Sequence, residues 1–171
     1  MADFDPAFKK TILIEGGYKL HETPGDTGGM TYAGVSRRWH PKWPGWKIID
    51  KEGSSGPRLA EHVRDFYRAQ FWDRMLGDEI KSQEIAESIY DFAVNAGKNV
   101  GFKLAQLTVG ASPDGAIGPK TVKLLNVETP EIFDMKFAIA KVARYAAICN
   151  GDFSQKKFLL GWLNRTMEVL A

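Results

Sequence analysis

The sequence predicts a mainly α-helical protein with a small lobe of loops and a short β-hairpin near its N-terminus. Three observations lead to this prediction. From residue 58 onward, apolar residues recur at the three- and four-residue spacing of amphipathic helices. Capping residues and Gly or Pro stop signals flank those stretches. Residues 18–35, by contrast, are rich in Gly, Thr and Tyr and contain the turn signal Pro24-Gly25-Asp26.

The first helix is expected to begin at Asp5, a capping residue, with Pro6 in its first turn. It ends where Gly16 follows Glu15, because glycine suits the left-handed cap position, and Glu15 therefore lies on the last turn. Residues 41–57 combine prolines, glycines and two tryptophans, and we expect an ordered surface loop there.

Helices follow through the rest of the chain. They are predicted over 58–76, 83–96, a short stretch around 100–107, a short stretch from Pro119, 130–150 and 154–170. The expected buried stripe of the first is Leu59, Val63, Phe66, Phe71 and Met75. Ser82 is the expected cap of the second. The expected inward residues of the third are Val100, Leu104 and Leu107.

Composition excludes several classes of protein. With 171 residues, of which 44% are hydrophobic, the chain has enough apolar mass for a core and is not intrinsically disordered. Its single cysteine, Cys149, rules out an internal disulfide, and we expect it buried in a helix. No apolar run approaches the roughly 18 residues of a membrane span, so we expect no membrane insertion.

The chain starts with an acidic stretch rather than a basic and then apolar one, which is not a standard secretory signal. We therefore expect synthesis in the cytoplasm and, for work elsewhere, another exit route.

Charge is split along the chain. Residues 1–92 carry 13 Lys and Arg against 15 Asp and Glu, a net of −2, whereas residues 93–171 carry 10 against 6, a net of +4. Either solvated faces differ by chance, or the basic half rests on an acidic polymer. The chain contains no dense run of Lys and Arg, so its charge pattern gives no indication of nucleic-acid binding.

The densest group of chemically informative residues begins with Glu15-Gly-Gly-Tyr18 and continues to Asp26, Thr31 and Gly34. Glycoside hydrolysis needs one carboxylic acid to protonate the leaving oxygen and a second carboxylate to stabilise the cationic state or activate water. Glycines let the backbone approach a sugar closely. The alternative is that Glu15 is only an acid at a helix end, Asp26 a turn residue and Thr31 a loop hydroxyl. Spacing alone leaves both interpretations open.

Other residues carry weaker indications. Tyr18 and Tyr32 either stack on sugar rings or pack within the lobe. Asn95 either binds an N-acetyl group or ties its loop to the helix, and Tyr90 has the same two alternatives. Core packing is the favoured role of Trp43, Trp46 and Trp72. The three histidines show no metal-ligand spacing, so neither a metal site nor a cofactor is expected.

Two blocks of the sequence resemble glycoside hydrolase family 108. The first runs from Glu15-Gly-Gly-Tyr18 through Asp26-Thr-Gly-Gly29 and Thr31 to Gly34. The second, which resembles the predicted peptidoglycan-binding region of that family, is Tyr90-Asp-Phe-Ala-Val-Asn-Ala-Gly97 with Asp114-Gly-Ala-Ile-Gly-Pro-Lys-Thr121. The family comprises N-acetylmuramidases found among phage endolysins and as bacterial secretion-activator proteins.

The resemblance implies a lysozyme-like fold with a catalytic region at 1–92 and a peptidoglycan-binding region at 93–171, packed into one compact, monomeric unit. It implies cleavage of the β-1,4 bond after N-acetylmuramic acid in the cell wall, with Glu15 as general acid and Asp26 and Thr31 at positions similar to those of phage-type lysozymes. The implied partner is peptidoglycan, in the periplasm or the wall of a host cell. Two alternatives are a lytic transglycosylase and a non-catalytic wall-binding protein in lysis or secretion.

Overall fold

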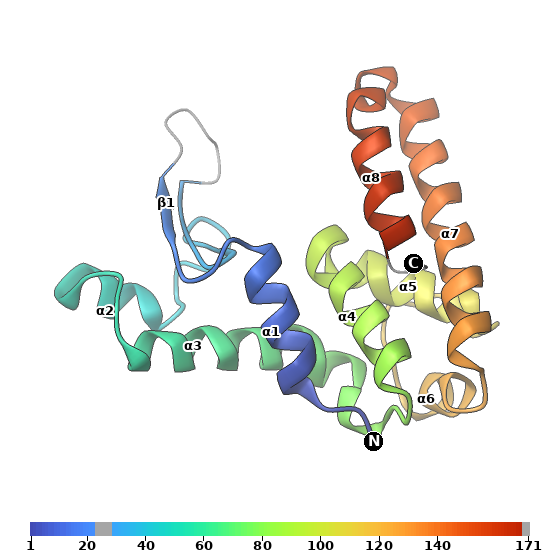
Figure 1. The fold of residues 1–171 in the computed structure, drawn as a ribbon, viewed down its shortest axis with the longest axis horizontal. Coiled ribbons are helices and arrows are strands. Elements are labelled where there is room, and N and C mark those ends of the chain that lie inside the picture. Colours follow the sequence, from blue (N-terminus) through green and yellow to red (C-terminus); the bar gives the residue numbers. More distant parts are fainter. Residues whose placement is uncertain (23–28, 169–171) are drawn as a thin grey trace. The chain divides into compact units, whose positions relative to one another are not determined.

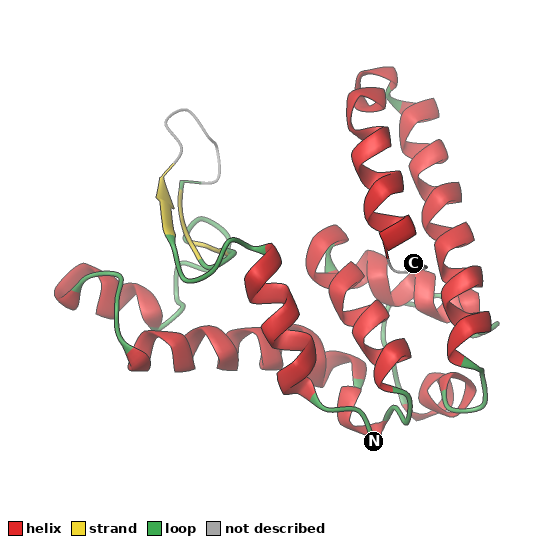
Figure 2. Cartoon of the chain, viewed as in Figure 1, coloured by secondary structure: helices red, strands yellow, loops and turns green. Residues whose placement is uncertain are grey.

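A computed structural model describes residues 1–22 and 29–168 of the chain. These residues form eight α-helices and one three-stranded antiparallel sheet near the N-terminus (Figures 1 and 2). The prediction of a mainly α-helical fold with a small hairpin lobe is therefore confirmed. The chain divides into two compact units, one comprising Asp3–Asp73 and the other running from Arg74 onward together with Met1 and Ala2.

The first unit contains the sheet and three helices. Its elements in order are α1 (Phe4–Ile14), β1 (Leu20–Glu22), β2 (Met30–Tyr32), β3 (Val35–Ser36), α2 (Gly45–Glu52) and α3 (Pro57–Tyr67). The middle strand is β2, in which Thr31 pairs with His21 of β1 and with Ser36 of β3. Phe4 belongs to the aromatic core, and its ring centroid lies 5.3 Å from that of Phe8 and 5.6 Å from that of Trp72.

The cap of α1 differs from the prediction. Asp3, not Asp5, is the N-cap, and its carboxylate accepts a hydrogen bond from the backbone N–H of Asp5 at 3.0 Å. Asp5 instead forms an ion pair with Arg64 of α3 at 2.6 Å. Both residues suit a cap by type, and the tertiary partner of Asp5 explains why the helix begins earlier.

The expectation of a surface loop over residues 41–57 was wrong, because α2 occupies Gly45–Glu52. Pro44 lies immediately before this helix, where its missing N–H costs no intrahelical hydrogen bond. Trp46 and Ile48, both in α2, are buried, and the indole N–H of Trp46 donates to the carbonyl of His40 at 2.9 Å. Packing of these apolar side chains thus outweighs the loop-like composition.

The buried stripe predicted for residues 58–76 is correct at its ends and shifted in its middle. Leu59, Val63 and Met75 are buried, but Tyr67 and Trp72 replace the expected Phe66 and Phe71. Tyr67 lies four residues after Val63 on the buried face of α3, whereas the expected Phe66 lies three residues after it. A π-helical segment, Arg68–Trp72, directly follows α3, and the five-residue step from Tyr67 to Trp72 spans it.

The second unit consists of α4 (Gln83–Ala96), α5 (Lys98–Thr108), α6 (Pro119–Leu125), α7 (Pro130–Gly151) and α8 (Lys156–Glu168). The helix α7 packs against α4, α5 and α8. The Ser82 cap of α4 is confirmed, since its hydroxyl accepts from the N–H of Ile85 at 3.2 Å. The predicted inward face of α5 was wrong, because Leu107 is exposed while Phe102 and Ala105 are buried.

A lysine lies in the core of this second unit. Lys141 of α7 is only 5% exposed, and its Nζ lies 5.1 and 4.4 Å from the ring centroids of Phe92 and Phe137. Burial lowers the pKa of Lys141 to about 8, although the charges of Asp91 and Asp134 favour its protonated form. Among the described residues, no helix combines the length and the apolar character that crossing a membrane requires.

Candidate active site

The position of Glu15 follows from how α1 ends. Glu15 is the C-cap residue, and Gly16 and Gly17 after it both adopt left-handed backbone, with φ of 82° and 81°. The N–H of Gly17 donates to the carbonyl of Ile12 at 2.8 Å, and that of Gly16 to the carbonyl of Leu13 at 3.2 Å. These two bonds form a Schellman motif, which requires residues that tolerate positive φ. The Gly-Gly pair therefore holds Glu15 in place at the helix end.

The Glu15 carboxylate lies against the turn that joins β2 to β3. Gly34 in this turn has φ of 79°, and a β-carbon placed on it would lie 3.0 Å from Oε2 of Glu15. The same β-carbon would overlap the hydroxyl of Tyr67, which donates a hydrogen bond to the carbonyl of Ala33 at 3.0 Å. Glu15, Gly34 and Tyr67 thus meet at one point, and only a glycine at position 34 leaves room for both side chains.

Sequence analysis missed Tyr67. The Tyr67 hydroxyl donates to the Ala33 carbonyl and so holds the turn against which the Glu15 carboxylate lies. The burial of Tyr67 follows from the four-residue step from Val63 within α3, whereas the predicted stripe took the three-residue step to Phe66. The nearest available indication was Gly34, since glycine is often found where two chain segments approach closely.

Of the two predicted catalytic partners of Glu15, the structure describes one. Thr31 lies at the centre of β2, half-buried, three residues before Gly34. Asp26 lies outside the described residues, so its carboxylate is not placed relative to Glu15. Both roles stay predictions.

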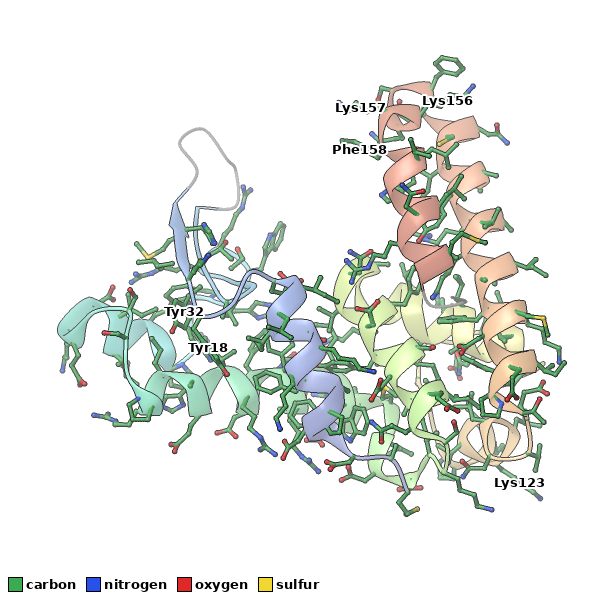
Figure 3. The ribbon with its side chains drawn as sticks, in the orientation of Figure 1. Tyr18, Tyr32, Lys123, Lys156, Lys157 and Phe158 are labelled. Carbon is green, nitrogen blue, oxygen red and sulfur yellow. The ribbon has the colours of Figure 1, made fainter. Side chains whose placement is uncertain are left out.

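The predicted sugar-stacking tyrosines also differ. Tyr18 is 44% exposed, whereas Tyr32 is 2% exposed and stacks on Trp43 with ring centroids 6.2 Å apart. Burial raises the pKa of Tyr32, and the neighbouring Tyr18 adds to that rise (Figure 3). Tyr32 therefore takes the packing alternative, because its ring lacks an open face, and Tyr18 remains available to a sugar.

The two candidates beyond residue 89 belong to the second unit. Asn95 is exposed near the C-terminus of α4, so its side-chain amide is accessible. Tyr90 is 1% exposed and lies within the same helix, which favours the packing alternative for its ring.

A metal centre receives no support from the described part of the chain. Within residues 1–22 and 29–168, no group of three or more His, Cys, Asp or Glu side chains is arranged to hold an ion. The Glu15 carboxyl group itself lies between a helix end and a glycine turn. Such a group suits proton transfer to or from a bound substrate.

Comparisons with known proteins point to a family. The family model for glycosyl hydrolase 108 matches residues 8–97, and the model for a predicted peptidoglycan domain matches residues 100–167. Among solved structures, that of Brucella abortus SagA is similar, with a TM-score of 0.73 and 26% identity over 97% of this chain and 90% of that chain. No curated protein sequence matches.

Proposed function

Because the chain belongs to glycosyl hydrolase family 108, we propose that it cleaves the β-1,4 bond between N-acetylmuramic acid and N-acetylglucosamine, with Glu15 as the general acid. The family resemblance found in the sequence is confirmed, and the chain is a lysozyme-like peptidoglycan hydrolase. The observation that carries the proposal for Glu15 is its place at the end of α1, with its carboxylate against Gly34 and beside Tyr67.

In this mechanism the Glu15 carboxyl donates its proton to the glycosidic oxygen as the bond to the sugar breaks. A general acid must keep its proton until the transition state, which needs a raised pKa. We propose that the half-buried position of Glu15 supplies that environment. Tyr67 acts on this site through the turn, because its hydroxyl donates to the Ala33 carbonyl and Gly34 leaves room for both the hydroxyl and the carboxyl.

A second carboxylate is needed to stabilise the positive charge that develops on the sugar or to activate water. We propose Asp26 for this role, assisted by the hydroxyl of Thr31 in holding a water molecule on the far side of the sugar. Attack by that water would invert the anomeric carbon. The support is the order of Glu15, Asp26 and Thr31 in the sequence. The strands β1 and β2, which precede and follow Asp26 in the sequence, pair with each other.

The peptidoglycan domain model matches residues 100–167, which lie within the stretch 93–171 of net charge +4. We propose that this region binds the wall and that Lys120 and Lys123 of α6 contribute. Both lysines are exposed, and neither forms an ion pair with a residue in the described part of the chain. Cations of this kind are free to meet the carboxylates of the peptide stems.

Mass spectrometry of purified peptidoglycan after digestion tests the proposed reaction. A muramidase leaves N-acetylmuramic acid at a reducing end. A 1,6-anhydro end would instead identify a lytic transglycosylase, which uses the sugar's own hydroxyl as nucleophile. Absence of soluble fragments, with binding to the wall retained, would identify a non-catalytic binding protein and contradict the proposal.

A further inference from the structure

The first unit contains an open pocket that the Glu15 site does not include. It has a volume of about 550 Å³, within the roughly 300–1,000 Å³ typical of small-ligand sites. One wall is the segment 39–44 between β3 and α2, and the other is one face of α3 that includes His62, Asp65 and Phe66.

The walls of the pocket are held by hydrogen bonds within the unit. The indole N–H of Trp43 donates to the carbonyl of His62 at 3.1 Å, which ties the segment to α3. The ring of His40 packs edge-on against Phe66 with centroids 4.6 Å apart. A pocket whose walls are already fixed needs little ordering when a ligand binds, which favours affinity.

The side chains at the rim are available to a ligand. Trp39 is 72% exposed, and its indole N–H has no hydrogen-bond partner among the described residues. The side chains of Lys42 and Asp65 are exposed and form no ion pair or hydrogen bond with another residue within 1–22 and 29–168. The guanidinium of Arg38 lies 5.3 Å from the Trp39 ring centroid and supports one side of it.

This combination fits a sugar. A pyranose offers an apolar face that stacks on an aromatic ring and a rim of hydroxyl and amide groups that exchange hydrogen bonds with charged side chains. A purely apolar ligand would leave Lys42 and Asp65 unused, and a simple anion would meet the carboxylate of Asp65.

The pocket is also close to Glu15 through packed side chains of the same unit. Phe66 in the pocket wall packs edge-on against Tyr67, with centroids 5.6 Å apart. Tyr67 in turn reaches Gly34 beside the Glu15 carboxylate. A polymer whose scissile bond lies at Glu15 has further sugars on either side, and these need binding sites away from that bond.

We propose that this pocket binds an N-acetylated hexose of the glycan strand, away from the bond that is cleaved, with Trp39 as the stacking platform. The inference rests on the proposed glycan substrate. Asp65 accepts hydrogen bonds from sugar hydroxyls, and Lys42 donates to the N-acetyl carbonyl. The pocket holds the strand and takes no part in the chemistry.

Binding is measured in the Glu15→Gln protein, so that the ligand stays intact. A six-sugar glycan fragment prepared from peptidoglycan is titrated against it by calorimetry, and the Trp39 indole N–H is followed by NMR. Trp39→Ala should weaken binding by about tenfold or more, as truncation of an aromatic anchor does. Trp39→Phe, which keeps a ring, should retain most of the affinity. The matched control is Phe153→Ala, because Phe153 of the second unit is 74% exposed.

Affinity of Trp39→Ala within twofold of the unchanged pocket, or a Trp39 indole signal that does not move, would overturn the proposal. Equal movement of that signal with a sugar-free stem peptide would identify a peptide site instead. These results are independent of catalysis. If walls are digested but the signal is still, only the pocket proposal fails. If the signal moves but walls are not digested, only the proposed reaction fails.

Discussion

Replacing Gly34 with alanine should both destabilise the first unit and displace Glu15, the proposed general acid. Left-handed backbone costs a non-glycine residue about 1–2 kcal/mol. The new methyl group would also overlap the Tyr67 hydroxyl, whose hydrogen bond to the Ala33 carbonyl contributes about 1 kcal/mol. We therefore expect a loss of about 2–3 kcal/mol in the free energy of unfolding, measured by urea denaturation followed by circular dichroism.

Activity should fall further than stability explains. The methyl group would lie 3.0 Å from Oε2 of Glu15 and 3.3 Å from its carboxyl carbon, which is closer than two such groups pack. Displacing a catalytic group by about 1 Å costs on the order of 100-fold in rate. We expect a loss of this size in wall lysis at temperatures where the variant remains folded.

Two further variants separate the causes. In a Tyr67→Phe background the overlapping hydroxyl is gone, so Gly34→Ala should cost only the backbone part, about 1–2 kcal/mol. Gly110 has a similar φ of 71° and nothing within 4 Å of its β-position, so Gly110→Ala should cost only that backbone part, about 1–2 kcal/mol, and leave lysis unchanged. An equal cost of Gly34→Ala in both backgrounds, or full activity of that variant, would refute the close approach at Gly34.

Two other predictions concern the second unit. The pKa of buried Lys141, about 8, lies below its ordinary 10.5, so the unfolded state binds more protons between these values and stability should rise as the pH rises through this range. Lys141→Met should abolish that rise and stabilise the protein at pH 7 by about 1–3 kcal/mol, as urea denaturation at pH 7 and 10 can show. Changing Lys120 and Lys123 to Gln should weaken pull-down on insoluble peptidoglycan and reduce its salt dependence. The control removes the same charge from Lys156 and Lys157, which lie at the opposite end of the unit (Figure 3), and equal losses from both pairs would contradict a specific role for α6.

Local patterns were sufficient for much of the fold. Ser82 and the Gly pair after Glu15 act on backbone groups within a few residues, so the sequence alone locates the start of α4 and the end of α1. The position of Glu15 at a helix end was predictable for the same reason.

Features set by distant packing were not predictable in this way. The helix α2 forms in a stretch rich in Pro and Gly because Trp46 and Ile48 are buried, which composition does not reveal. Tyr67 reaches the candidate site because it, rather than Phe66, lies on the buried face of α3, and the apolar pattern of the sequence allows either residue there. The close approach at Gly34 depends on three segments meeting, so it becomes visible only in the folded structure.

The most direct test of the central claim is the rate at which Glu15→Gln releases reducing ends from purified peptidoglycan. Gln has almost the same shape as Glu, but its side-chain amide has no acidic proton that it could transfer to the glycosidic oxygen. We predict a rate about 10²- to 10⁴-fold below that of the parent, with an unchanged circular dichroism spectrum. A rate within threefold of the parent, from a protein with the same spectrum, would show that Glu15 is not the general acid.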